Sequence, residues 1–99
     1  MRNIENHIDE VRELCKLYNV VKMYLFGSVL GKEFTEQSDV DFLVKFKEID
    51  LAIYFENYIN FKTNLASLLG RDVDLLEEQT LKNPILIRNI HKSKELIYG

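Results

Sequence analysis

A glycine–serine pair and two closely spaced aspartates are the residues of this 99-residue chain best suited to chemistry. Gly27 and Ser28 directly follow an apolar run, and Asp39 and Asp41 begin the next one after the spacer 29–38. Glycine lets a phosphate approach the backbone, and a serine at a helix start adds a hydroxyl to free N–H groups. Two neighbouring carboxylates repel each other unless a hard cation such as Mg²⁺ lies between them. Together the two pairs indicate a site that handles a nucleotide.

Two apolar stretches are expected to form the strands that position these residues. Residues 20–26 are apolar on both sides, which is typical of a strand covered on both faces. In a second expected strand, 39–46, side chains alternate, so Asp39 and Asp41 point to the same side. The spacer 29–38 is expected to hold a short helix and then a loop. The alternate residues of the second strand point into a core: Val40, Phe42, Val44 and Phe46.

The segment GSVLGKEFTEQSDVDFLVKF resembles the motif of the nucleotidyltransferase superfamily related to DNA polymerase beta. The family pattern is Gly-Ser, a spacer of about this length and Asp-x-Asp, with a third acidic residue on a later strand. The resemblance covers nearly the whole chain and is greatest to the minimal nucleotidyltransferases of prokaryotes, which are often encoded beside a helical HEPN-type partner. It implies one minimal nucleotidyltransferase domain over residues 1–99. The fold implied is α/β and polymerase-beta-like: a small mixed sheet of three or four strands flanked by helices.

The same resemblance implies a metal site with three carboxylates. Asp39, Asp41 and Asp74 would be the catalytic residues and would bind two Mg²⁺ ions, with Mn²⁺ as the alternative. By resemblance to the family's pattern, Asp74 is the third acidic residue, in the piece Val73-Asp74-Leu75 of an expected strand, 71–76. Asp72, on the same face of that strand, is the alternative third carboxylate.

Nucleotide binding is assigned by the resemblance to Gly27, Ser28 and Lys32, with ATP as the substrate. The spacer departs from the family here, since many members have arginine and then glycine where this chain has Gly31 and Lys32. Lys32 either replaces the basic group that meets a phosphate or is a solvated surface lysine. This difference in the spacer is expected to affect the rate of turnover more than the fold.

Helical periodicity accounts for most of the remaining chain. A first amphipathic helix is expected to end at Asn19, which tolerates the left-handed conformation, and a long helix to end at Gly70. Asn83 and Pro84 are a favoured N-cap and first residue of a further helix. Residues 95–98 form either a fourth strand or a frayed helical end. The expected apolar faces are Ile4, Ile8, Val11, Leu14, Cys15 and Tyr18; Leu51, Tyr54, Phe55, Tyr58, Phe61, Leu65, Leu68 and Leu69; and Ile85, Leu86 and Ile90, with Ile87 as a further candidate.

Composition excludes several classes of protein. The net charge of −3 gives no electrostatic footprint for general nucleic-acid binding, although it leaves room for a local basic patch. The single cysteine, Cys15, has no partner for an internal disulfide and is expected to be a small buried hydrophobe. No segment resembles a signal peptide or a membrane span, which predicts a cytoplasmic protein.

The resemblance implies transfer of AMP from ATP to a tyrosine of a HEPN-type toxin ribonuclease, which makes the chain an antitoxin and a metal-dependent protein adenylyltransferase. The partner would be encoded alongside, and a homo-oligomer is possible. Two alternatives stay open. The chain is a binding subunit that masks its partner with weak or no catalysis, or it transfers a nucleotide to a small molecule such as an aminoglycoside. Absence of an acceptor domain disfavours the last.

Overall fold

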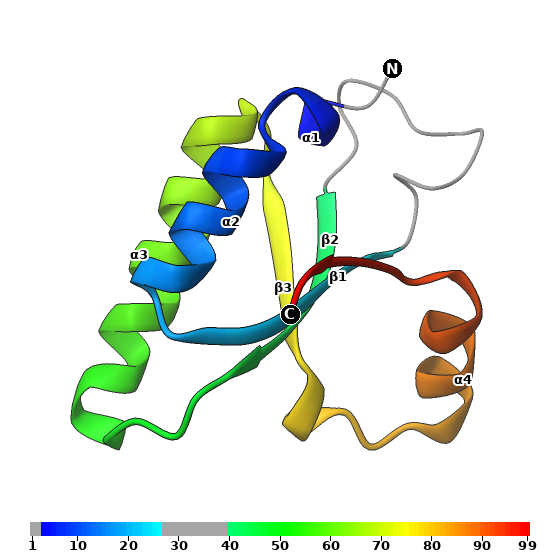
Figure 1. Cartoon of the computed structure of the whole chain (residues 1–99). Helices are drawn as coiled ribbons and strands as arrows, with labels where there is room; N and C mark the ends of the chain where they lie inside the picture. The colour runs from blue at the N-terminus through cyan, green and yellow to red at the C-terminus, as the bar shows by residue number, and fades with distance from the viewer. Residues whose placement is uncertain (1–2, 27–39) are drawn as a thin grey trace.

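The computed structural model describes residues 3–26 and 40–99, and it contains one four-stranded sheet with helices on both faces (Figure 1). The strand order is β3-β2-β1-β4. The pairs β1–β2 and β1–β4 are antiparallel, whereas β2 and β3 are parallel. The elements are α1 (Asn3–Asn6), α2 (Ile8–Leu17), β1 (Val20–Phe26), β2 (Val40–Phe46), α3 (Leu51–Leu69), β3 (Val73–Glu77), the 3-10 turn η2 (Glu78–Thr80), α4 (Pro84–Ser93) and β4 (Glu95–Tyr98).

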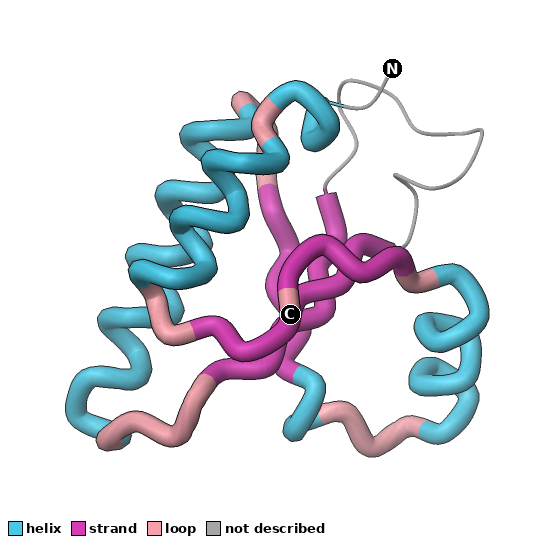
Figure 2. The backbone as a smooth tube through the Cα atoms, in the orientation of Figure 1, coloured by secondary structure: helices cyan, strands magenta, loops and turns pink. Residues whose placement is uncertain are grey.

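Helices α2 and α3 lie side by side on one face of the sheet, and α4 lies on the other (Figures 1 and 2). Helix α3 connects the parallel strands β2 and β3, so β2–α3–β3 is a crossover unit. This arrangement is the mixed sheet flanked by helices that the sequence predicts.

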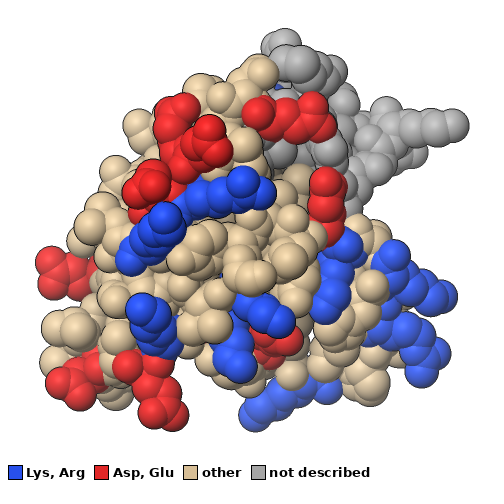
Figure 3. Space-filling model, in the orientation of Figure 1, with Lys and Arg blue, Asp and Glu red and all other residues tan. Residues whose placement is uncertain are grey.

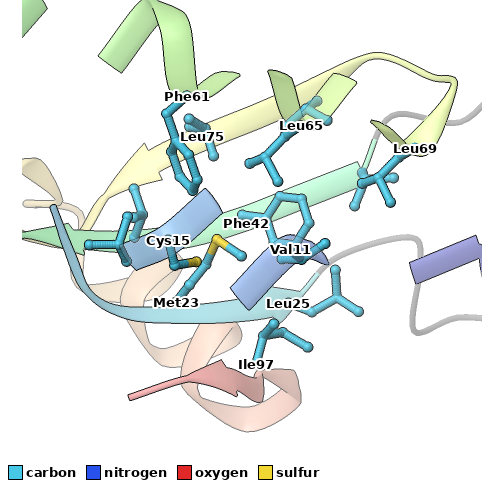
Figure 4. Close-up of a cluster of buried hydrophobic side chains, with 14 of the residues drawn as sticks. Val11, Cys15, Met23, Leu25, Phe42, Phe61, Leu65, Leu69, Leu75 and Ile97 are labelled. Atoms are coloured by element: carbon cyan, nitrogen blue, oxygen red, sulfur yellow. The ribbon is translucent and has the colours of Figure 1, made fainter. Parts of the chain in front are cut away.

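The main core lies between the sheet and the helices α2 and α3 (Figure 4). Phe61, Leu65 and Leu69 of α3 point toward the sheet, and Val11 and Cys15 of α2 fill the space beside them. The buried strand residues beneath them include Met23, Leu25, Phe42, Val44, Leu75 and Ile97. Burial of Cys15 confirms its prediction as a small core hydrophobe.

A smaller cluster joins α4 to the opposite face of the sheet. Phe26, Leu43 and Ile90 are buried together there, and Tyr24 and Leu76 pack against them. Strand β1 therefore has apolar contacts on both faces, as its sequence predicts.

Several local predictions are confirmed at the ends of the helices. Asn19 has a φ of 64° just after α2, and Gly70 has a φ of 69° just after α3. The side-chain oxygen of Asn83 accepts hydrogen bonds from the backbone N–H groups of Ile85 and Leu86, so Asn83 is the N-cap of α4. Residues 95–98 form a strand, which decides between the two alternatives left open by their periodicity.

Other expectations are wrong in detail. The first helix is interrupted at His7, which separates α1 from α2. Leu51 and Phe55 are not core residues, since they are 72% and 62% exposed. Tyr54 and Tyr58 pack on Phe46 of the sheet, so Phe55 is exposed because it lies to one side of the face that they form. Ile85 and Leu86 are exposed because α4 turns only its Ile90 side fully onto the sheet. The third strand starts at Val73 rather than Arg71, so Asp72 precedes it.

Both edge strands are contacted by a helix side chain. The hydroxyl of Tyr58 on α3 donates a hydrogen bond to the Leu75 carbonyl of β3 at 2.7 Å. The Arg12 Nε on α2 donates to the Ile97 carbonyl of β4 at 3.0 Å. These bonds fix the two helices against the outer strands. None of the helices within residues 3–26 and 40–99 combines the length and the apolar character that a bilayer span requires.

Candidate active site

Asp41 and Asp74 are paired neighbours on the parallel strands β2 and β3. Paired residues on adjacent strands point to the same face, and neighbouring strands lie about 4.8 Å apart. Phe26 of β1 pairs with Asp41 from the other side, so one row of residues crosses three strands. We call Phe26, Asp41 and Asp74 the acid row. It brings together two of the three predicted carboxylates.

The acid row lies on the face of the sheet that α4 covers. Asp41 and Asp74 each lie two residues before the leucines that join the Ile90 cluster, and side chains two apart share a face. Asp41 is half-buried, whereas Asp74 is exposed. The two carboxylates therefore lie next to the apolar cluster beneath α4, at an end of the sheet that is polar and accessible.

The remaining predicted site residues lie outside the described residues. They are Gly27, Ser28, Gly31, Lys32 and Asp39. The part of the chain that the structure describes ends at Phe26 and resumes at Val40, directly beside the acid row. Assignments of phosphate binding to Gly27, Ser28 and Lys32, and of metal binding to Asp39, stay predictions.

Asp72 and Asp74 differ in how the fold holds them. Asp74 lies within β3 and in register with Asp41, whereas Asp72 comes just before the strand. The carbonyl of Asp72 accepts a hydrogen bond from the Val40 N–H at 3.0 Å, so its backbone closes the start of the parallel pair. The strand pairing thus favours Asp74 as the partner of Asp41.

An open hollow of about 430 Å³ borders the carboxylates on the α3 side. Asp72 and Asp74 line it from the start of β3, and Lys62 lines it from α3. The hollow lies on the α3 side of β3, whereas Asp41 and Asp74 share the face of the sheet that α4 covers. Nothing in the sequence singles out Lys62, because its place beside Asp72 and Asp74 depends on how α3 crosses the edge of the sheet.

Two tyrosines connect α3 to the other end of β3. Tyr54 donates a hydrogen bond to the Glu77 carboxylate, and Tyr58 donates to the Leu75 carbonyl. Burial, followed by the negative charges of Glu77 and Asp74, raises the pKa of the Tyr58 hydroxyl. Both hydroxyls therefore stay protonated at neutral pH and act as hydrogen-bond donors. Both rings pack against the main core, as predicted for the apolar face of this helix.

The described part of the site fits a divalent cation in its chemistry. Asp41 and Asp74 supply carboxylate oxygens, the donors that Mg²⁺ and Mn²⁺ prefer. Within residues 3–26 and 40–99 no group of three acidic, histidine or cysteine side chains gathers. The third ligand that the sequence predicts, Asp39, precedes Val40 and is not among these residues.

The family described as polymerase beta, nucleotidyltransferase matches residues 9–99 of the chain. The chain belongs to this nucleotidyltransferase family. The match spans the sheet, α3, α4 and the acid row, and so confirms the family that the Gly-Ser and Asp-x-Asp motifs indicate.

Similar proteins place this nucleotidyltransferase among small members of the family. The protein adenylyltransferase MntA of Thermococcus cleftensis is 39% identical over 75% of this chain and 72% of its own. A solved structure described as a proposed minimal nucleotidyltransferase has a TM-score of 0.78 and 30% identity, and the match covers 96% of this chain and 95% of that one.

An MNT antitoxin shares the fold at lower identity. The structure of a tri-AMPylated Shewanella oneidensis HEPN toxin in complex with its MNT antitoxin matches with a TM-score of 0.66 and 21% identity. That match covers 96% of this chain and 71% of the other. The polymerase-beta-like fold predicted from the sequence is therefore the fold of the chain.

Proposed function

We propose that this nucleotidyltransferase transfers AMP from ATP to a tyrosine hydroxyl of a HEPN-type toxin encoded alongside it, and so acts as an antitoxin. The observation that carries the proposal is the pairing of Asp41 with Asp74 at an open end of the sheet. The relative named as a protein adenylyltransferase supports the reaction type, and the antitoxin of the same fold supports the class of partner.

In the proposed reaction the acceptor oxygen attacks the α-phosphorus of ATP. A new phosphorus–oxygen bond forms, the bond from the α-phosphorus to the bridging oxygen breaks, and pyrophosphate leaves with that electron pair. Asp74 is exposed beside the half-buried Asp41 and is the described carboxylate best placed to orient the acceptor hydroxyl or take its proton. Catalysis then depends mainly on positioning and on charge neutralisation.

The activity is proposed to depend on a divalent metal, Mg²⁺ or Mn²⁺. Asp41 and Asp74 would hold it with Asp39, since all three are carboxylates on or beside the same strand pair. A bound metal would neutralise phosphate charge and lower the pKa of the attacking hydroxyl. The residues of this chain fix the distance between the two carboxylates through the β2–β3 pairing.

Intact-mass spectrometry tests the proposal directly. The HEPN-type protein is incubated with this protein, ATP and Mg²⁺, beside an Asp39→Ala/Asp41→Ala control and a sample with excess EDTA. We expect the mass of the HEPN-type protein to increase by one or more AMP units only with the unaltered protein and metal. A stable complex without any mass increase would contradict the proposal and favour neutralisation by masking. Transfer to a small molecule instead would assign another acceptor.

A further inference from the structure

Positive charge is concentrated in one segment of an otherwise acidic chain. Residues 79–94 contain four Lys and Arg and no Asp or Glu, whereas the rest of the chain contains nine Lys and Arg against sixteen Asp and Glu. Figure 3 shows Lys and Arg side chains gathered over α4. Lys94 at the end of this segment lies 4.2 Å from the ring centre of Tyr24, so the positive charge reaches the sheet surface.

The outward side of α4 combines this charge with apolar area. Ile85, Arg88 and Lys92 recur at helical spacing and are all exposed, with Asn89 between them. We call these four residues the α4 outer face. Ile85 is 67% exposed, and the structure gives neither Arg88 nor Lys92 an ion pair with a described residue. This surface therefore offers a partner both positive charge and one exposed apolar side chain.

The α4 outer face lies beside the proposed reaction. Ile90 on the inner side of α4 packs on Phe26, which belongs to the acid row. A protein acceptor must bring its hydroxyl to Asp41 and Asp74 on the face of the sheet that α4 covers. Helix α4 therefore lies on the same face of the sheet as the carboxylates that the acceptor hydroxyl would approach.

We propose that the acceptor protein docks on the α4 outer face through an acidic surface of its own. This inference rests on the proposed function and adds where the partner binds and with which charge. Opposite charges across the interface would speed association and fix the orientation of the acceptor. The favoured occupant is a protein because transfer of AMP to a protein requires such contact for every turnover.

A charge-reversal pair tests the docking surface. The test variant is Arg88→Glu/Lys92→Glu, and the control is Lys16→Glu/Lys47→Glu, which makes the same change of charge away from α4. We expect the test variant to raise the Kd and the KM for the HEPN-type protein about tenfold or more, and to leave kcat and the Kd for ATP unchanged. The control should change each value by less than about twofold. The affinity of the unaltered protein should fall steeply between 50 and 300 mM NaCl.

The remaining outcomes overturn the inference in separate ways. If the unaltered protein transfers AMP and the test variant binds and reacts equally well, docking on α4 is wrong while the proposed function stands. If the unaltered protein neither binds nor modifies the HEPN-type protein, both fail. A higher Kd for ATP in the test variant would place Arg88 and Lys92 in the nucleotide site rather than on a docking surface. The test variant could instead keep its affinity for the HEPN-type protein and lose binding to a labelled RNA oligonucleotide, which would assign the surface to RNA. If it lost only self-association, the surface would be assigned to a second copy of this chain.

Discussion

The hydroxyl of Tyr58 donates a hydrogen bond of 2.7 Å to the carbonyl oxygen of Leu75, on an outer strand of the sheet. Leu75 follows Asp74 directly, so this bond holds the strand that carries one member of the acid row. Phe46, on the neighbouring strand, lies against the Tyr58 ring with 6.3 Å between ring centres. The tyrosine therefore contributes both a donor to the strand and an aromatic surface to the core.

Removal of the Tyr58 hydroxyl should destabilise the protein. We expect Tyr58→Phe to lower the free energy of unfolding by about 1 kcal/mol, because the ring stays packed while one hydrogen bond is lost. Urea denaturation measures this change. Tyr98→Phe is the matched control, since the Tyr98 hydroxyl has no hydrogen bond to a described residue, and it should stay within about 0.5 kcal/mol. Equal stability of both variants would show that the strand is held in another way.

Substitution of Asp72 and of Asp74 should affect the proposed AMP transfer to different extents. We expect Asp74→Asn to lower kcat/KM for AMP transfer by about 100-fold or more, because Asp74 is in register with Asp41. Asp72→Asn should lower it by less than about threefold, because only the backbone of Asp72 joins the strand pair. Steady-state kinetics with the acceptor protein measures both. A larger loss from Asp72→Asn would assign the third carboxylate to Asp72.

The N-cap of α4 should contribute to stability and to docking together. Asn83→Ala removes the acceptor of the Ile85 and Leu86 N–H groups and should cost about 1 kcal/mol. Asn89→Ala, at an exposed position within the same helix, should cost less than about 0.5 kcal/mol. Thermal unfolding of the two variants provides the comparison. If α4 presents the docking surface, Asn83→Ala should also weaken acceptor binding, while ATP binding should be unaffected.

The contribution of Cys15 to the free energy of unfolding should decrease at alkaline pH. Burial raises the pKa of its thiol from 9.0 to about 12. Above pH 9 the unfolded chain loses this proton while the folded protein keeps it, so stability falls as pH rises toward 12, by about 1.4 kcal/mol per pH unit. Cys15→Ala should be less stable at pH 8, and the difference from the unaltered protein should shrink by about 2 kcal/mol at pH 10.5. Urea denaturation at each pH measures the free energy of unfolding of both proteins. A difference between them that stays the same from pH 8 to pH 10.5 would contradict this prediction.

Local signals in the sequence predicted much of the fold. Gly70 and the Asn83–Pro84 pair marked helix ends because their conformations depend on neighbouring backbone alone. Burial of Phe55 and Ile85 was predicted wrongly, because helical spacing shows which residues lie near one face but not how wide the buried part of that face is. The interruption at His7 was missed for a similar reason, since both sides of it keep a helical pattern.

The candidate site was predictable only in part. The motif at Asp39 and Asp41 and the alternation around Asp74 led to the right family and the right strands. The register between Asp41 and Asp74 depends on contacts between distant segments, and so does the place of Lys62 in the lining of the hollow. Such contacts leave no periodic pattern in a single sequence, and so neither was predicted.

The crossover from β2 through α3 to β3 also determines when Asp41 and Asp74 can come together during synthesis of the chain. Asp41 and Asp74 lie on opposite sides of α3 in the sequence and meet only through the pairing of β2 with β3. A nascent chain therefore lacks the Asp41–Asp74 pair until β3 has left the ribosome and α3 has packed on the sheet. Fraying of α4 would leave this pair intact, whereas release of α3 would separate it. The proposed transfer activity would then report the docking of α3 during folding.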